Sequence, residues 1–433
     1  MSSLKFLYFL LLGLFISSCT QQSPDAQQIK FQFAVNNGGI TLPDSFQAVV
    51  VADSVGAARH IAVNDNGDIY VALRSAQDGN GLVALRDTNG DGKADSTAYF
   101  GEYTGTGVRI HDNHLYFSST TAVYRYPLKD EQLVPEGEPE TIISGFPDQN
   151  THAAKSFTFD NEGNIYVNVG APSNSCQEEA RTPGSLGIEP CPQLERQAGV
   201  WQFNATKTGQ TQVDDGHRYA TGIRNSVALR WSSTANALYS VQHGRDQLST
   251  LWPDYFDNKQ SALLPSEDFL LIKDGSNFGW PYTYYDWQKD QRILAPEYGG
   301  DGEKTPEAGK YQDPIMTFPG HWAPNDVLFY SGEQFPESYG SGAFIAFHGS
   351  WNRAPEPQAG YKVVFVPFSG ELPSGDYKVF ADNFAGKESF TSPSDAKHRP
   401  MGLAVGPDGS LYITDSAKGK IWRILYTGGE EMM

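Results

Sequence analysis

A short strand–turn–strand pattern recurs along the chain, and it limits the possible folds more than any other feature. An apolar-alternating segment leads into an Asn/Asp/Gly turn, and a second alternating segment follows with an aromatic residue near its start. Period-two alternation around such turns predicts antiparallel hairpins. Six copies occur, the fourth less regular and the fifth degenerate, at residues 60–75, 108–119, 156–170, 227–244, 341–351 and 402–416. Their repetition predicts an all-β, six-bladed β-propeller, because a β-sandwich explains single hairpins but not the repeat.

The composition agrees with one large, turn-rich domain. The chain has 433 residues with 44 glycines and 26 prolines, and it is 39% hydrophobic. The longer gaps near 170–200 and 250–335 predict loop insertions on one face of the propeller, where such folds carry function. The formal net charge of -19 repels phosphate backbones and anionic lipids, so we expect no nucleic-acid partner.

The N-terminus predicts export. Lys5 precedes an apolar run from Phe6 to Ile16, which is too short for a permanent membrane span, and small residues then lead into Cys19. The Ile-Ser-Ser-Cys segment resembles the lipobox of bacterial lipoproteins, although an ordinary secretion signal is the alternative. We therefore expect a signal peptide over 1–19 and a lipidated Cys19. A flexible tether over 20–37 and a propeller domain over 38–427 follow, in a protein held at the bacterial cell envelope only through its lipid.

Two cysteines remain, Cys176 and Cys191, on either side of a Gly/Pro/Ser-rich segment without strand or helix periodicity. Outside the cytoplasm such a pair predicts a disulfide rather than two free thiols. Closing this loop would contribute about 3 kcal/mol in the chain-entropy model.

A calcium loop is predicted after the first copy of the repeat. Oxygen ligands stand at positions 1, 3, 5 and 9, with Gly92 at the tight sixth position and a backbone carbonyl at the seventh. Position 12 holds Ala98 where an EF-hand has Glu, so the pattern is typical of a structural loop between strands. A metal-free Asp/Asn/Gly turn is the alternative. The predicted ligands are Asp87, Asn89, Asp91, the Lys93 carbonyl and Asp95.

Chemistry-bearing residues gather where blades begin. His152 precedes the third copy, Arg224 and Asn225 precede the fourth, and Lys397 and Arg399 open the sixth. Basic groups at these positions of an acidic chain suit a small polyanion on the propeller axis, although solvated loop ends would look the same.

Five segments carry a family resemblance. They are Gly222–Asn225 (GIRN), His243–Asp246 (HGRD), Asn277–Pro281 (NFGWP), His348–Arg353 (HGSWNR) and Arg399–Tyr412 (RPMGLAVGPDGSLY). In this order, over roughly residues 40–425, they resemble the soluble quinoprotein sugar dehydrogenases, nearest to the L-sorbosone or pyranose dehydrogenase type. The resemblance implies a six-bladed propeller that holds pyrroloquinoline quinone (PQQ) and Ca²⁺.

The resemblance also implies roles for individual residues. His152 matches the general base, Arg224 and Asn225 match the pair beside the reactive carbonyl of the quinone, and the carbonyls of Gly244 and Arg245 match the ligands of the catalytic Ca²⁺. Lys397 and Arg399, joined by Arg59, match the basic residues that bind the quinone carboxylates. The lysine that another branch uses at the cofactor has no clean match. His348, Trp351 and Arg353 are weak candidates for its place.

The chemistry implied is oxidation of a sugar (an aldose, a pyranose or a sorbosone-like substrate). His152 would take the hydroxyl proton, and a cofactor must accept the hydride because side chains do not. Ca²⁺ would act as Lewis acid and Arg224 would stabilise developing charge. The aromatic segment Trp280–Trp287 is either a stacking face for the sugar or plain core. A separate electron acceptor is expected, since the chain has no haem-attachment motif. The rival hypotheses are a non-catalytic glycan-binding propeller and a gluconolactonase-like calcium hydrolase.

Overall fold

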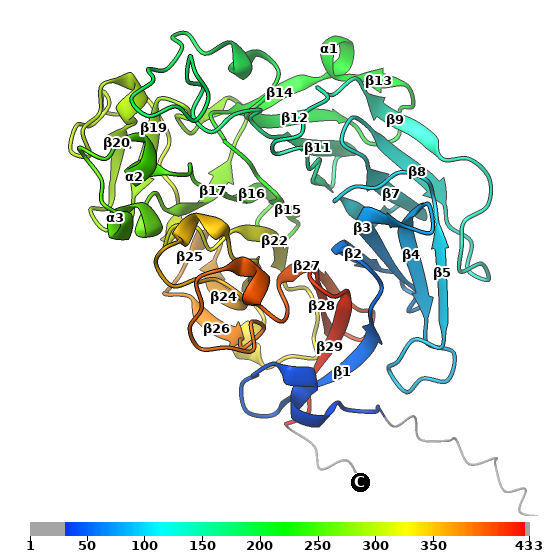
Figure 1. Ribbon diagram of the computed structural model, residues 1–433. Coiled ribbons are helices and arrows are strands. Elements are labelled where there is room, and N and C mark those ends of the chain that lie inside the picture. Colours follow the sequence, from blue (N-terminus) through cyan, green and yellow to red (C-terminus); the bar gives the residue numbers. More distant parts are fainter. Residues whose placement is uncertain (1–30, 429–433) are drawn as a thin grey trace, which may run out of the picture.

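Six antiparallel sheets are arranged around a common centre in the computed structural model, which describes residues 31–428. The first strand of each sheet lies innermost, and each inner strand contacts the inner strands of the two neighbouring sheets, which closes a ring. In Figure 1 the inner strands β2, β15, β22 and β27 surround this centre. The architecture confirms the predicted six-bladed β-propeller.

The first three blades follow the chain in order. Blade 1 contains β2 (Ala58–Val63), β3 (Ile69–Gln77), β4 (Asn80–Arg86) and β5 (Ser96–Phe100). Blade 2 contains β6 (Val108–His111), β7 (His114–Ser118), β8 (Val123–Pro127) and β9 (Glu140–Ser144), with β13 (Gln210–Thr211) parallel to β9. Blade 3 contains β10 (Phe157–Phe159), β11 (Asn164–Val169), β12 (Gly199–Asn204), β14 (His217–Thr221) and the short β18 (Ser276–Asn277).

The other three blades complete the ring. Blade 4 contains β15 (Ala228–Ser232), β16 (Ala237–Gln242), β17 (Glu267–Ile272) and β21 (Met316–Phe318). Blade 5 contains β22 (Pro324–Phe329), β23 (Gly342–Phe347), β24 (Lys362–Ser369), β25 (Leu372–Pro373) and β26 (Lys378–Ala381). Blade 6 contains β27 (Pro400–Val405), β28 (Leu411–Asp415), β29 (Lys420–Tyr426) and β1 (Phe46–Asp53).

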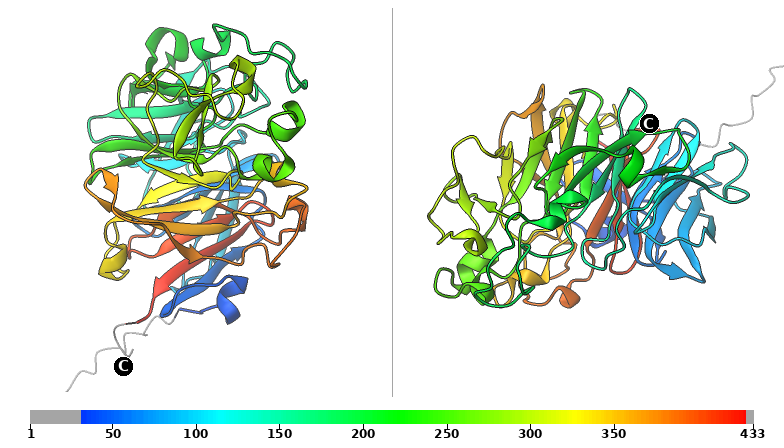
Figure 2. Two further views of the ribbon diagram at one scale, coloured as in Figure 1. Left: turned by 90° about the vertical axis from the view of Figure 1, so that its left-hand side faces the viewer. Right: turned by 90° about the horizontal axis from the view of Figure 1, so that it is seen from above.

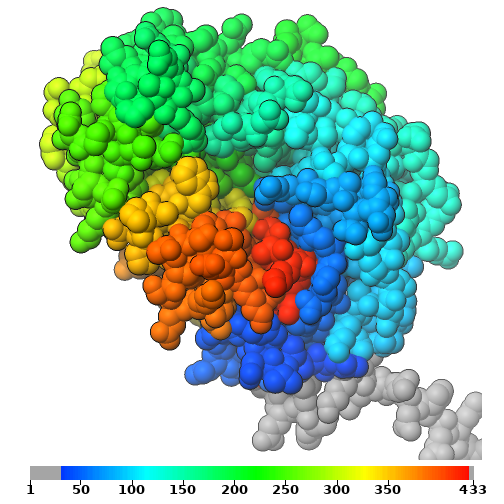
Figure 3. Space-filling view, in the orientation of Figure 1, coloured from blue at the N-terminus to red at the C-terminus, as the bar shows by residue number. Residues whose placement is uncertain are grey.

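The N-terminal strand β1 closes the ring by pairing with the C-terminal strand β29, from Phe46 opposite Tyr426 to Asp53 opposite Lys420. The space-filling view shows the red C-terminal residues beside the blue N-terminal ones (Figure 3). This pairing covers the outer edge of β29, which would otherwise expose unpaired backbone groups. The first and last parts of the domain are therefore held together by one sheet.

Turn glycines explain why the repeat forms hairpins. Gly67, Gly163 and Gly409 lie between the first two strands of blades 1, 3 and 6, with φ of 89°, 86° and 82°. Only glycine adopts this left-handed conformation without steric cost. The flanking strands are buried on both faces, because each sheet packs against two neighbours; for example, Tyr239 of blade 4 and Val327 of blade 5 belong to one apolar cluster.

The gap at 250–335 is not one continuous insertion, because it also contains the blade strands β17, β21 and β22. One insertion, between β16 and β17, carries α2 (Leu248–Leu251) and α3 (Asn258–Leu263). The other, between β17 and β21, carries the hairpin β19 (Thr283–Asp286) and β20 (Gln291–Leu294). Both project beyond the strands of blade 4 (Figures 1 and 2). The degenerate fifth copy, 341–351, covers only the second strand of blade 5, since its first strand is β22.

Short helices occupy the remaining connections. Besides α1 (Gln212–Asp215), they are the 3-10 turns Val35–Gly39, Pro192–Glu195, Pro296–Tyr298, Glu337–Tyr339, Trp351–Arg353 and Pro393–Asp395. Within residues 31–428 no helix has the length and apolar character needed to span a membrane.

The last part of the predicted tether is packed against the propeller. Gln32 N–H donates to the Asp91 carbonyl at 2.9 Å, and Ala34 N–H donates to the Ala48 carbonyl at 2.8 Å. Within the described residues, the backbone is thus already paired with blades 1 and 6 before residue 37, where the predicted tether ends. The signal peptide and Cys19 lie outside the described residues.

Candidate active site

Two adjoining cavities lie where the inner strands begin. One, of about 400 Å³, is lined by Arg59, Arg74, Thr106, His152, Asn225 and neighbouring residues. The other, of about 290 Å³, is lined by Arg224, Gly244, Asp246, Glu267, Arg399 and others. Both are lined by His152, His243 and Asn325, so they meet at these side chains. Blades far apart in sequence thus converge on one site.

Three arginines make the site strongly electropositive. Burial, together with the positive charges of the nearby guanidinium groups of Arg74 and Arg399, lowers the pKa of Arg59 to about 9. Arg59 Nε donates to Thr106 Oγ1 at 3.2 Å and Arg399 Nε donates to the His348 carbonyl at 3.1 Å. Among the described residues, none of the three arginines forms a salt bridge. Uncompensated positive charge in a partly buried cavity favours a ligand with several negative groups.

His152 is held in one tautomer at the junction of the cavities. Its Nδ1 lies 2.7 Å from the Ala171 carbonyl. Since a carbonyl only accepts, Nδ1 carries the proton and the lone pair of Nε2 can accept one. Burial, and then the positive charge of Arg224, lowers the pKa of His152 to about 3. The imidazole is therefore neutral, and in its proton-accepting form, at neutral pH.

A close approach of backbone brings Asn225 beside His152. A Cβ added at Gly170 would lie 2.6 Å from His152 Cβ and 2.9 Å from Asn225 Oδ1, so only glycine fits there. The Oδ1 atom of Asn225 is buried and has no hydrogen-bond partner among residues 31–428. An orphaned buried acceptor in a cavity wall indicates a ligand that donates to it.

Arg224 is fixed by an ion pair that sequence reasoning did not single out. Its guanidinium bonds Asp246 Oδ2 at 2.8 Å, the Asn174 carbonyl at 3.1 Å and the Gly244 carbonyl at 2.8 Å. Asp246 also binds Arg181 at 2.9 Å and Asn352 Nδ2 at 2.6 Å. Its pKa lies well below the ordinary range because the charge of Arg224, above all, outweighs the cost of burial. Asp246 stands in the quoted HGRD segment, which was the available signal.

A buried carboxylate stands beside the predicted calcium ligands. Glu267 accepts hydrogen bonds from Gly244 N and Ala323 N, both at 3.1 Å, and it forms no salt bridge within the described residues. Burial raises its pKa to about 8. The side chain of Arg245 points away from the cavity and pairs with Glu297 of the insertion. Within the described residues the Glu267 carboxyl thus has no basic partner, and with this pKa it is mostly protonated at neutral pH unless a cation lies beside it.

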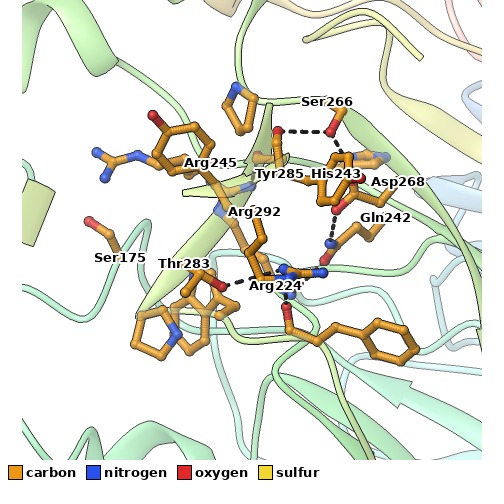
Figure 4. A pocket seen from close by; sticks show the side chains of 16 residues that line it. Ser175, Arg224, Gln242, His243, Arg245, Ser266, Asp268, Thr283, Tyr285 and Arg292 are labelled. Carbon is orange, nitrogen blue, oxygen red and sulfur yellow. Dashed lines mark hydrogen bonds between the residues drawn. The ribbon is translucent and has the colours of Figure 1, made fainter. Parts of the chain in front are cut away.

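Behind Arg224 lies a small cavity of about 20 Å³, and hydrogen-bonded polar side chains form part of its wall (Figure 4). Arg224 N donates to Gln242 Oε1 at 3.2 Å, and Gln242 Nε2 donates to Asp268 Oδ2 at 2.8 Å. Ser266 Oγ donates to the other Asp268 oxygen at 2.5 Å. This chain of hydrogen bonds fixes the backbone of Arg224 from below. The cavity is too small for a substrate.

The structure does not bring every predicted cofactor residue to the site. Lys397 is exposed and packs over Gly386, because the backbone N–H groups of residues 397 and 398 bond to the segment after β26. Arg353 binds the carbonyls of Ala262 and Gly320, which ties its turn to α3. Neither lines a cavity of the site, whereas Arg74, which sequence reasoning missed, does.

Two of the weak candidates do border the site. His348 lines the cavity of about 290 Å³, and its Nε2 atom lies 2.6 Å from Ser416 Oγ. Trp351 borders the same cavity and is 54% exposed, so its ring is available at the rim. In contrast, the aromatic segment 280–287 is core: Trp280 donates to the Asn174 carbonyl at 3.0 Å, and Tyr284 packs inside the insertion.

The predicted calcium loop folds as a self-bonded turn. Asp87 accepts from the N–H groups of Gly90 and Gly92, both at 2.7 Å, and Asp95 accepts from Thr88 N at 2.8 Å. Asp91 accepts from Lys93 N at 2.8 Å. Within the described part of the chain, no group of three or more His, Cys, Asp or Glu side chains has a metal-binding arrangement. Calcium at this loop, with Asn89 as a ligand, stays a prediction.

The predicted disulfide is confirmed between Cys176 and Cys191. It lies in the segment between β11 and β12 that brings Asn174 against Arg224. The bridge therefore restrains a loop that forms part of the site.

Known proteins share this sequence pattern and this fold. A family model described as TrAA12-like matches residues 40–427. The chain belongs to the TrAA12-like family. This family comprises PQQ-dependent sugar dehydrogenases, which confirms the resemblance found in the sequence.

Two curated relatives of the TrAA12-like chain are fungal. It is 23% identical over 458 residues to a PQQ-dependent pyranose dehydrogenase of Coprinopsis cinerea, covering 95% of this chain and 57% of that protein. It is 23% identical over 449 residues to a PQQ-dependent sugar dehydrogenase of Hypocrea jecorina, covering 95% of each. The chain thus spans little more than half of the Coprinopsis protein.

Solved structures share the fold of the TrAA12-like chain. The holo form of the PQQ domain of Coprinopsis cinerea pyranose dehydrogenase matches with a TM-score of 0.68 and 20% identity, covering 92% of this chain and 98% of that one. A calcium structure of the Trichoderma reesei family AA12 enzyme matches with a TM-score of 0.71 and 17% identity, covering 93% and 99%.

Proposed function

We propose that this protein oxidises a sugar, with PQQ as hydride acceptor and Ca²⁺ at the same site. The observation that carries the proposal is the cluster of Arg59, Arg74 and Arg399, which forms no salt bridge and shares a junction with the neutral base His152. An acidic chain that concentrates unpaired guanidinium groups at one end of its axis is built for a small polyanion. PQQ carries three carboxylates.

The residues present fit this cofactor. Arg59, Arg74 and Arg399 would bind its carboxylates, and the orphaned Oδ1 of Asn225 would accept from a ring N–H. The bound quinone would supply the hydride-accepting centre that no side chain provides. Arg74, which lines the cavity, would take the carboxylate-binding role that the resemblance implied for Lys397.

A cation fits beside Gly244. We propose the carbonyls of Gly244 and Arg245 as Ca²⁺ ligands and Glu267 as the negative charge that favours the ion. The Gly244 oxygen already accepts from Arg224, but a carbonyl has two lone pairs and can meet a second partner. An unpaired carboxylate with its pKa raised by burial is stabilised by a divalent cation nearby.

His152 would accept the proton of the sugar hydroxyl at Nε2. The hydrogen bond from Nδ1 to the Ala171 carbonyl keeps the ring oriented and stabilises the charge that protonation creates. Arg224, held by Asp246, would stabilise negative charge that develops on the acceptor. The exposed ring of Trp351 offers an apolar face for the sugar at the rim.

We also propose that electrons leave to a separate acceptor protein or small carrier and that the chain acts at the cell envelope, anchored through Cys19. A Cys19→Ala variant should appear in the soluble fraction of cells that retain the wild-type protein in membranes. If both partition alike, the anchor is not at this cysteine.

The experiment that tests the function is reconstitution of the purified protein with PQQ and Ca²⁺. Addition of an aldose or pyranose should reduce the bound quinone, seen as a change in its absorbance, and an artificial electron acceptor should sustain turnover. If the protein binds PQQ but none of the sugars reduces the bound quinone, the proposed oxidation is refuted.

Arg399→Gln and Lys397→Gln form a matched pair for this experiment. Loss of a charge-assisted hydrogen bond should weaken PQQ binding by Arg399→Gln about tenfold or more. Lys397→Gln should bind like wild type, because Lys397 lies outside the cavity. The opposite ranking would overturn the assignment of the arginine cluster.

A further inference from the structure

Another cavity, the distal cavity, opens at the other end of the inner strands. It has a volume of about 490 Å³ and is lined by residues of blades 2, 3 and 4 where their first strands end. Each of these strands runs from one cavity to the other: Thr106, Ala154 and Val227 border the proposed PQQ cavity, whereas Arg109, Thr158 and Arg230 border this one. The two cavities are roughly 10 Å apart along a strand. They are separate sites.

Two arginines and one carboxylate meet at this distal cavity. Arg109 is 6% exposed and binds Asp326 Oδ1 at 3.0 Å, while its Nε is buried without a hydrogen-bond partner in the described part of the chain. Arg230 donates through Nε to the Val327 carbonyl at 3.2 Å and forms no salt bridge within residues 31–428. Asp326 also accepts from the N–H groups of Val327 and Leu403, so Oδ1 has two donors and Oδ2 has one, none of them from Arg230.

The guanidinium of Arg230 is therefore only partly compensated. Burial and the charge of Arg109 lower the pKa of Arg230 to about 9, and Asp326 offsets this only in part. His60, which faces Asp326 from blade 1, is neutral at neutral pH because burial lowers its pKa to about 4. Desolvated positive charge without a partner is costly, so an open cavity beside it favours an anion.

Two further carboxylates border the cavity but do not neutralise Arg230. Asp160 accepts hydrogen bonds within its own turn, from Glu162 N and Asn164 N at 2.8 Å, and from Tyr166 Oη at 3.0 Å. Asp112 is exposed at the mouth, 3.4 Å from His111. Neither forms a salt bridge with Arg109 or Arg230.

Aromatic rings form part of an otherwise polar wall. His111 stacks on Phe159 with ring centroids 4.2 Å apart, and Trp231 stacks on Tyr166 at 5.5 Å. A planar, charged group at the arginines with an organic body against these rings would match both parts of the cavity.

We propose that this distal cavity binds a small oxyanion, with its carboxylate or phosphate group between Arg109 and Arg230. Guanidinium groups bind both kinds of oxyanion through paired N–H donors. The site does not depend on the proposed PQQ chemistry, because it shares no lining residue with the PQQ cavity.

Isothermal titration of the PQQ-free protein tests the proposal. Gluconate and inorganic phosphate are titrated separately at constant ionic strength, with glucose as the neutral probe. Saturable binding of gluconate points to an organic carboxylate, and binding of phosphate alone points to the inorganic ion. Either supports the distal site only when Arg230→Gln weakens it, because the cluster of Arg59, Arg74 and Arg399 also attracts anions in the PQQ-free protein. Binding of neither anion, or equal binding of glucose, overturns it.

Arg230→Gln should weaken that binding about tenfold or more, by loss of a charge-assisted donor. Arg218→Gln is the matched control, since Arg218 is exposed on β14 and lies outside both cavities. A structural role for Arg230 would lower the melting temperature in anion-free buffer. Removal of a partly compensated charge should leave it unchanged or raise it. Equal losses of affinity in both variants would refute the assignment.

Discussion

Replacing Asp246 with Asn should expose how far Arg224 depends on its ion pair. The side chains of Arg224 and Asp246 are only 3% and 10% exposed, so the charge of Arg224 would remain buried after its partner becomes neutral. Breaking a buried pair costs 3–5 kcal/mol in general. Arg224 keeps its bonds to the carbonyls of Gly244 and Asn174, which places the expected loss near the lower end, about 3 kcal/mol.

For a domain of this size that loss corresponds to a fall of about 4 °C in melting temperature, measured by scanning calorimetry. Turnover of the reconstituted protein should fall about tenfold, because Arg224 is no longer held in place, whereas PQQ affinity should change little. The affinity depends on the separate cluster of Arg59, Arg74 and Arg399.

Two controls make the result decisive. Asp274→Asn removes a carboxylate that is 62% exposed and pairs with His217 at the surface, so we expect less than about 0.5 kcal/mol. The double variant Arg224→Gln/Asp246→Asn should be about 1–2 kcal/mol more stable than Asp246→Asn alone, since it removes the stranded charge. Additive destabilisation in the double variant, or an unchanged melting temperature in the single one, would refute the reasoning.

Three further predictions follow from the site and the loops. His152→Ala should reduce kcat at least 10²-fold with PQQ binding retained. Wild-type kcat should show no loss near pH 6.5, because the pKa of His152 is lowered to about 3; a loss there would contradict the assignment. Stability should fall as pH drops from 6.5 towards 4, since buried His60, with a pKa of about 4, binds a proton only after unfolding. His60→Gln should reduce the slope of the unfolding free energy against pH by about 1.4 kcal/mol per pH unit relative to wild type. Glu267 contributes to this slope with the opposite sign, but it is present in both proteins, so its contribution cancels in the comparison. If the loop with Asp91 holds calcium, EDTA should lower the melting temperature of wild type but not of Asp91→Ala; equal shifts would show that it holds none.

The repeat predicted most of the propeller because its information is local. Alternation and a turn glycine define a hairpin within about fifteen residues, and five of the six copies coincide with the first two strands of a blade. The fifth failed because the turn of blade 5 is long: β22 ends at Phe329 and β23 begins at Gly342. The alternating pattern could not show that these strands pair.

The sequence predicted those site residues whose motifs stand directly before an inner strand. His152, Arg224 and Asn225 all border the cavities for that reason, and so do Arg59 and Arg399. Lys397, two residues from Arg399, does not, because backbone hydrogen bonds to the segment after β26 turn its side chain outward. Such pairing between distant segments has no sequence pattern.

By itself, the sequence determined the fold class and the disulfide, since each rests on residue type and local spacing. The tertiary structure alone decided which charges meet. Arg74 joins Arg59 and Arg399, Asp246 pairs with Arg224 across the site, and Glu267 stays unpaired beside Gly244. The physical reason is that ring closure brings strand ends together from every blade, and the energy of a charge depends on the neighbours and burial that it finds there.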